Sequence, residues 1–157
     1  MVDGTHLHGK YGGNLMIATA QDANNQIYPF AFAIVDSEND DTWTWFFEQL
    51  HKVIPNATDF VFVSDRHKSI AKGIQKVYSQ DNHVVCTRHL KENLKNLFKK
   101  KGTHGLFTLA SNSYTKIEFG EYFQKICNMD SAMGDYLLIA NLEKWARSHF
   151  RGTKYYL

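Results

Sequence analysis

Two aspartates stand out because each adjoins an apolar stretch that is typical of a β-strand. Asp65 follows residues 60–64, in which four consecutive apolar residues precede a serine. A run that is apolar on both faces predicts a buried central strand, and the carboxyl end of such a strand is where open α/β sheets place ligands. Asp3 lies in the strand predicted for residues 2–8. Two carboxylates at neighbouring strand ends would suit Mg²⁺ or Mn²⁺, which take oxygen ligands.

A pair of such ions roughly 3.5–4 Å apart activates the attacking oxygen and stabilises the leaving oxygen of a phosphodiester displacement. Both aspartates also have a structural interpretation. Asp3 and Gly4 form a dipeptide that is common in turns, and Asp65 is well placed to cap the helix predicted after it. The spacing alone leaves both interpretations open.

A second candidate site is the segment from Cys86 to His89, which places a thiol and an imidazole one helical turn apart. The pair supplies two of the four ligands of a structural zinc site, and the sequence has no CxxC or HxxxH motif to complete it. A nucleophilic Cys–His pair is another interpretation. The third is a buried thiol beside an imidazole that makes local hydrogen bonds.

Basic side chains run along the helix predicted for residues 86–101. This stripe is the strongest local positive charge in the chain, and it suits either a DNA backbone or a solvated helix face. Its members are Arg88, Lys91, Lys95 and Lys99, followed by Lys100 and Lys101.

Three histidines and three glutamates are weaker candidates. The histidines are placed where they could approach a phosphate or a metal, although such residues more often lie on the surface. The glutamates lie on predicted helices, and the sequence does not direct any of them toward the sheet. The six residues are His6, His8, His67, Glu118, Glu121 and Glu143.

The hydrophobic pattern predicts the elements that position these residues. Apolar runs at 15–20 and 28–35, separated by turn residues, predict a hairpin that follows the first strand. A helix with a heavy aromatic face begins near Asp40 and ends at Pro55. The strand at 60–64, a helix, a short strand at 83–86 and the helix at 86–101 complete the core.

This order, β-β-β-α-β-α-β-α followed by helices, predicts an α/β fold with a ribonuclease H-like mixed sheet. The first and fourth strands are neighbours in that sheet, so Asp3 would lie beside Asp65. We expect residues 1–101 to form the core, which lacks part of its first strand. Residues 102–157 are expected to form a helical extension or insertion.

Composition restricts the function further. The chain has 157 residues, 43% of them hydrophobic, and a net charge of only +2, so any nucleic-acid site must be a local patch. No apolar run approaches membrane-spanning length. The two cysteines suggest reduced thiols in an intracellular protein rather than a disulfide framework.

Several motifs in this order resemble the transposase domain of Mutator-like elements (MULEs), which plant far-red-response transcription regulators share. The resemblance covers roughly residues 1–100, and its most specific part is the CxxH segment. The motifs are Asp3-Gly4-Thr5, Pro29-Phe30-Ala31, the Trp-rich helix, Val63-Ser64-Asp65, Cys86-Thr87-Arg88-His89-Leu90 with Asn93, and Trp145-Ala146-Arg147 with Phe150.

The resemblance implies a DDE metal site with Mg²⁺ or Mn²⁺ that cuts and joins DNA at transposon ends. Asp3 and Asp65 match the first and second catalytic acids, and Cys86 and His89 match a CxxH pair with an auxiliary or structural role. The family's third acid is a glutamate in a segment expected beyond Leu157. We therefore expect a fragment of a longer protein that is incomplete and inactive alone.

Besides a different ribonuclease H-like nuclease, which would require a third or fourth acid converging on the same site, two functions remain open at this point. One is a fragment of a transposase core, with the basic stripe along DNA and a possible homo-oligomer in the full-length protein. The other is a domesticated, non-catalytic DNA-binding or transcription-regulatory module. Nuclear localisation is expected from the family and the DNA substrate, and no membrane association is expected.

Overall fold

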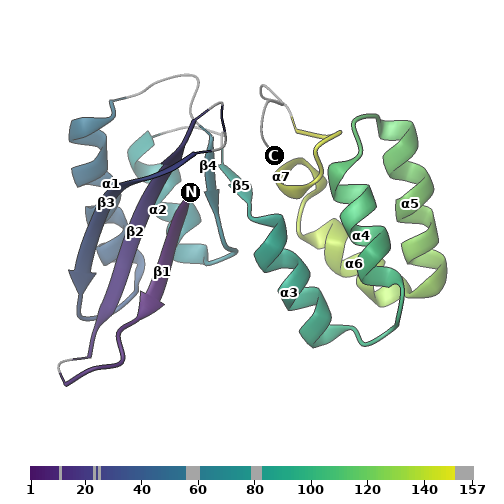
Figure 1. Ribbon diagram of the computed structural model, residues 1–157, viewed down its shortest axis with the longest axis horizontal. Helices are drawn as coiled ribbons and strands as arrows, with labels where there is room; N and C mark the ends of the chain where they lie inside the picture. Colours follow the sequence, from purple (N-terminus) through teal and green to yellow (C-terminus); the bar gives the residue numbers. More distant parts are fainter. Residues whose placement is uncertain (11, 23, 25, 56–60, 79–82, 151–157) are drawn as a thin grey trace. The chain divides into compact units, whose positions relative to one another are not determined.

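The computed structural model describes residues 1–10, 12–22, 24, 26–55, 61–78 and 83–150. The chain divides into two compact units, residues 1–83 and 84–157. This division falls before the boundary at residue 101 that the order of predicted elements suggests, and that boundary stays a prediction. Figure 1 follows the chain from the strands of the first unit to the helices of the second.

The first unit begins with three antiparallel strands in the order β1-β2-β3, as the turn residues predict. They are β1 (Val2–His6), β2 (Asn14–Gln21) and β3 (Ile27–Val35). A register shift between Ala18 and Thr19 of β2 lies opposite the start of β3, next to Pro29. Proline has no backbone N–H to donate to the ladder, so it is tolerated where the strand pairing is irregular, as it is here.

The helix α1 (Asp40–Val53) follows β3 and begins at Asp40, as the sequence predicts. Asn39, rather than Asp40, is the N-cap: its side chain accepts from the backbone N–H groups of Asp41 and Thr42. The hydroxyl of Thr42 accepts the Asn39 N–H in return, which completes a capping box. Asp40 and Asp41 occupy the first turn, where negative charge favours the helix dipole.

The chain then forms β4 (Phe62–Ser64), α2 (Lys68–Tyr78) and β5 (His83–Val85). The predicted start of β4 at Phe60 lies outside the described residues. β4 pairs with β5 in a two-stranded sheet. Cα atoms of β1 and β4 come within 8 Å of one another, although the described residues of these strands form no hydrogen-bonded ladder.

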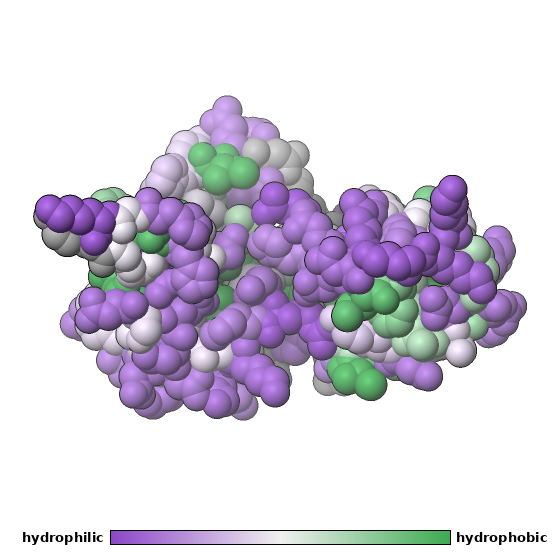
Figure 2. All heavy atoms as spheres, turned by 90° about the horizontal axis from the view of Figure 1, so that it is seen from below, coloured by the Kyte–Doolittle hydropathy of each residue, from purple (hydrophilic) through white to green (hydrophobic). Residues whose placement is uncertain are grey.

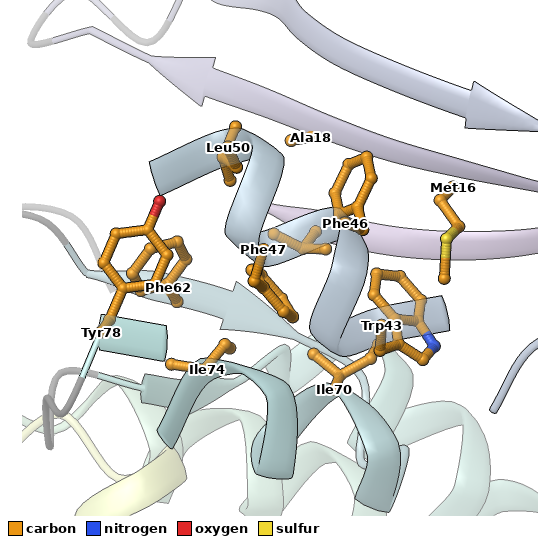
Figure 3. Close-up of a cluster of buried hydrophobic side chains, with 11 residues drawn as sticks. Met16, Ala18, Trp43, Phe46, Phe47, Leu50, Phe62, Ile70, Ile74 and Tyr78 are labelled. Carbon is orange, nitrogen blue, oxygen red and sulfur yellow. The ribbon is translucent and has the colours of Figure 1, made fainter. Parts of the chain in front are cut away.

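The core of the first unit lies where α1 and α2 pack together against one face of the three-stranded sheet. Figure 3 shows aromatic rings of α1 between the sheet and α2. Gly73 of α2 permits the close packing, because a Cβ there would lie 2.7 Å from a ring carbon of Phe47. The buried side chains of this cluster are Val2, Met16, Ala18, Trp43, Phe46, Phe47, Leu50, Phe62, Ile70, Ile74 and Tyr78.

The opposite face of the sheet leaves large apolar side chains exposed. Phe32 and Ile34 of β3 are 77% and 69% exposed, whereas Ala31 and Ala33 alternate with them and pack on the core. This alternation shows that α1 and α2 cover only one side of β3.

The second unit is helical and has its own core. Its elements are α3 (Thr87–Leu97), α4 (Thr103–Asn112), α5 (Lys116–Met129), α6 (Ser131–Ile139) and the single turn α7 (Leu142–Trp145). The core contains Leu90, Leu94, Phe107, Ala110, Phe119, Ile126, Met133, Leu137, Ala140, Trp145 and Ala146. The predicted helix at 86–101 is therefore too long: α3 ends at Leu97, and Gly102, with a φ of 91°, begins the next helix.

The mixed α/β class and the order of elements agree with the sequence analysis. The three-stranded sheet and the β4–β5 sheet are separate in the hydrogen-bond pattern of the described residues. The ribonuclease H-like topology, which joins them into one sheet, stays a prediction.

Candidate functional site

Asp3 lies on β1, on the face of the sheet that α1 and α2 do not cover. The strand register pairs Asp3 with Ile17 of β2, and Ile17 with Phe32 of β3. The next row, Gly4 with Met16, lies on the other face, where Met16 is fully buried. Asp3 is half-buried, and its Oδ1 accepts the Gly4 N–H at 3.0 Å.

Asp65 directly follows β4 and is also half-buried. Its Oδ1 accepts the backbone N–H of His67 at 2.9 Å, which forms a turn just before α2. Phe62 and Ser64 of β4 are buried, so the alternation of the strand directs Val63 toward the opposite side, and Asp65 follows at the end of the strand.

The nature of these donors fits Mg²⁺ or Mn²⁺. Such ions are commonly held by one or two carboxylates, with water and substrate phosphate completing the coordination. Within the part of the chain that the structure describes, no group of three or more His, Cys, Asp or Glu side chains is arranged to hold a metal. Asp3 and Asp65 would therefore provide a partial site that needs further ligands.

Glu38 is an acid near this site that the sequence analysis missed. It lies in the segment between β3 and α1, just before Asp40, Asp41 and Thr42, residue types that are typical of a helix start. The Glu38 carboxylate accepts a hydrogen bond from the indole of Trp43 at 3.0 Å. In the sequence, the only indication of this contact is that an acid stands five positions before a tryptophan, and that spacing is too common to predict a hydrogen bond.

Cys86 and His89 lie at the start of α3, in the second unit. Cys86 is the N-cap residue of α3, although its side chain makes no capping hydrogen bond. His89 Nε2 lies 3.3 Å from Nη2 of Arg88. Both cysteines are free thiols. The zinc, nucleophilic and structural interpretations of this pair all stay predictions.

The basic stripe is only partly available to a ligand. Arg88, Lys95 and Lys99 are exposed, whereas Lys91 is half-buried and donates to the hydroxyl of Thr108 at 2.6 Å. Lys99 lies beyond the end of α3 and donates to the carbonyl of Lys95. Lys100 also donates to a carbonyl, that of Met129. Lys101 is exposed as well, so the charges of the stripe that are exposed and donate to no carbonyl in the contacts described are Arg88, Lys95 and Lys101.

Of the three late glutamates, Glu118 has a local hydrogen bond, Glu121 is exposed and Glu143 is half-buried. Glu118 and the N-cap Thr115 form a box in which Thr115 accepts the Glu118 N–H and Glu118 accepts the Tyr114 N–H. The Glu143 N–H donates to Asn141 at the start of α7. Glu121 is exposed on α5. Among the weaker histidine candidates, His6 and His8 are exposed, while His67 lies beside Asp65.

The face drawn in Figure 2 is mostly hydrophilic, with apolar residues in separate patches. No described helix has both the length and the apolar character needed to cross a membrane.

The first unit is thus a mixed α/β unit in which β1, which carries Asp3, approaches β4, which Asp65 follows. Comparison with known proteins identifies which family it represents. The MULE transposase domain matches residues 1–93, more than half of the chain, and the chain belongs to that family.

Curated relatives agree with this assignment. The transposase for insertion sequence element IS256 in transposon Tn4001 of Staphylococcus aureus is 29% identical over 90 residues, which are 57% of this chain. The corresponding transposase of Enterococcus faecalis (strain ATCC 700802 / V583) gives the same values. The chain spans about a fifth of the length of these relatives, since the match covers 22% of each.

Proposed function

We propose that this chain is part of a DDE-type transposase core, in which Asp3 and Asp65 hold Mg²⁺ or Mn²⁺ for DNA strand cleavage and transfer by the full-length protein. One observation carries the proposal. Asp3 lies on β1 and Asp65 directly follows β4, and the Cα atoms of these two strands approach within 8 Å. Both aspartates lie inside the matched segment.

The chain by itself supplies binding and orientation rather than a complete reaction. Asp3 and Asp65 provide hard oxygen donors, and one oxygen of each is already oriented by a backbone N–H. The metal, when bound, would activate the attacking oxygen and stabilise the leaving oxygen. A third acid from outside the chain is part of this proposal, because the family's third acid is expected in a segment beyond Leu157.

Metal binding is the first test, and it uses the 157-residue chain with Mn²⁺ as the probe. Electron paramagnetic resonance of free Mn²⁺ should show binding that Asp65→Asn weakens by more than about 100-fold, beyond the usual loss for an outer-shell partner. Asp3→Asn should act in the same way. Asp22→Asn, in the turn between β2 and β3, is the control. Unchanged Mn²⁺ affinity in both site variants would contradict the metal site.

The second candidate function is a domesticated, non-catalytic DNA-binding or transcription-regulatory module. The exposed charges of Arg88 and Lys95 in the second unit favour it, because their contribution to DNA binding would need neither aspartate. Mn²⁺-dependent nicking by the full-length protein would favour the transposase. DNA binding and reporter regulation that survive Asp65→Asn, without nicking, would favour the regulatory module.

DNA binding itself can be tested on the basic stripe. Lys95→Ala should reduce the slope of log K against log salt concentration by roughly 1, because one phosphate contact is lost. Lys125→Ala, on α5 of the same unit, is the matched control. A nuclear location and a homo-oligomer of the full-length protein remain part of this proposal.

A further inference from the structure

Glu38 is held in place by the core of the first unit. Its Oε1 accepts the Nε1–H of Trp43 at 3.0 Å, and Trp43 is completely buried. In Figure 3 the indole nitrogen lies at the edge of the aromatic cluster rather than among the rings. The buried ring therefore fixes one oxygen of the carboxylate, whose side chain is itself only 18% exposed.

The fixed carboxylate lies directly against β1 at Gly4. A Cβ at Gly4 would lie 2.8 Å from Oε1 of Glu38 and 3.0 Å from both Cδ and Oε2. Real Cβ atoms do not approach this closely, so glycine is the residue that permits the contact. Gly4 is also the residue whose N–H donates to Oδ1 of Asp3. Glu38 thus contacts the backbone that orients the first candidate acid.

The same carboxylate approaches the turn that carries the second acid. Oε1 of Glu38 lies 3.9 Å from Nδ1 of His67. The backbone N–H of His67 donates to Oδ1 of Asp65, at 2.9 Å. Glu38 therefore lies close to the residue whose amide orients a candidate acid both on β1, at Gly4, and in the β4–α2 turn, at His67.

We propose that Glu38 is a positioning residue that braces β1 and the β4–α2 turn against each other and so sets the placement of Asp3 and Asp65. This inference rests on the proposed metal-dependent function of these two aspartates. Glu38 acts through Gly4 and His67 and is not assigned as a ligand, in keeping with the absence of a three-residue metal group from the described residues.

A brace of this kind makes a specific demand on the side chain. It must reach from the segment before α1 to β1, accept a hydrogen bond from Trp43 and lie flat against a glycine. Glutamine has the same length and keeps an oxygen acceptor for the indole, whereas alanine keeps neither. Glu38→Gln should therefore preserve most of the positioning, and Glu38→Ala should remove it.

The test uses the 157-residue chain and measures two things separately: the backbone amides of Gly4 and His67, and the affinity for Mn²⁺. In Glu38→Ala, the backbone N–H signals of both Gly4 and His67 should shift in ¹⁵N–¹H spectra, and their hydrogen exchange should quicken. Mn²⁺ affinity should fall roughly 10-fold, as for an outer-shell partner of a metal site. Glu38→Gln should recover most of both effects, and Glu48→Ala, an exposed acid on α1, should reproduce neither.

Gly4→Ala examines the same contact from β1. The added Cβ must displace the Glu38 carboxylate, so this variant should shift the amide of His67, although the two residues are far apart in sequence. It also keeps the inference testable if Glu38→Ala does not fold.

The outcomes separate the brace from the metal site. If the amide of either Gly4 or His67 is unchanged in Glu38→Ala, the brace is wrong, even where Asp65→Asn abolishes Mn²⁺ binding. A Glu38→Gln variant as defective as Glu38→Ala also overturns it. If the wild-type chain binds no Mn²⁺ while both amides respond, the proposed function fails and the brace stands.

Discussion

In the first unit, several side-chain hydrogen bonds join α1 to α2 and β4 to β5, whereas in α4 of the second unit two hydroxyls bond within their own helix. Asp40 accepts from Ser69 and Lys72 of another helix, and Ser64 lies 2.8 Å from the imidazole of His83. In α4, by contrast, the hydroxyls of Thr108 and Ser111 donate to carbonyls three or four residues earlier.

This difference accounts for where chemistry can be assembled. Strand pairing and helix packing in the first unit bring carboxylates from separate segments to one region. The basic stripe of the second unit comes largely from one helix, so its residues are neighbours already in the sequence. The first unit is therefore the one whose function depends on intact long-range packing.

The largest expected effect comes from removing Trp43, which is both a core residue and the donor to Glu38. Trp43→Ala should lower the free energy of unfolding by about 3–5 kcal/mol, because a large buried ring is replaced by a cavity. It should also weaken Mn²⁺ binding. Urea denaturation measures the loss of unfolding free energy, and hydrogen exchange of the β2 amides shows that the loss occurs in the first unit.

Trp45→Ala is the matched control for this prediction, since Trp45 lies on the same helix but is 46% exposed. It should cost clearly less than Trp43→Ala. Equal losses in the two variants would mean that the first unit does not depend on the Trp43 contacts described here.

A core substitution in the second unit should destabilise without touching the metal site. Leu94→Ala, at a fully buried position of α3, should cost about 2–5 kcal/mol. Leu97→Ala, at a 59% exposed position of the same helix, should cost much less. Hydrogen exchange in α5 reports the loss. A matching loss of Mn²⁺ affinity in Leu94→Ala would break the contrast between the units.

A smaller effect is expected from glycines in helices. Gly73→Ala should destabilise by about 1–3 kcal/mol, because the new Cβ would lie 2.7 Å from Phe47 in the first core. Gly120→Ala on α5 should instead stabilise by up to about 1 kcal/mol, since no atom lies within 4 Å of its new Cβ and alanine favours the helix. Thermal unfolding of both variants shows whether Gly73→Ala lowers the melting temperature while Gly120→Ala raises it.

The smallest effect concerns Asp40, which is exposed. Its hydrogen bond from Lys72, and then that from Ser69, hold the pKa of the Asp40 carboxyl below its ordinary value of 3.8. A lowered folded-state pKa contributes stability that is present above the unfolded-state value and is lost as the pH falls through the folded-state value. Asp40→Asn should therefore be less stable than wild type at neutral pH, and the difference should begin to shrink as the pH falls below about 4 and disappear only below the lowered folded-state pKa.

The urea midpoint between neutral pH and acid measures this effect. Lys72→Met should reproduce more of it than Ser69→Ala, because Lys72 is the larger cause of the lowered pKa. A pH profile of Asp40→Asn parallel to that of wild type would show that the Asp40 contacts do not contribute in solution.

The sequence by itself identified the features that depend on local pattern. The hairpin of β2 and β3, the aromatic face of α1 and the start of α3 after Cys86 all follow from periodicity and turn residues. The family followed from the order of short motifs, and the match to residues 1–93 confirms it. These signals are readable because side-chain alternation and helical spacing depend on near neighbours.

Tertiary structure alone decided which residues meet. The approach of β1 to β4, the bond that occupies Lys91 and the place of Glu38 between Gly4 and His67 depend on contacts between distant segments. The sequence Asp3-Gly4 does not show whether the glycine forms a turn or leaves room for the carboxylate of Glu38. Only the packing of Trp43 against the sheet brings Glu38 to that glycine, because a hydrogen bond from a buried ring leaves its partner little freedom to lie elsewhere.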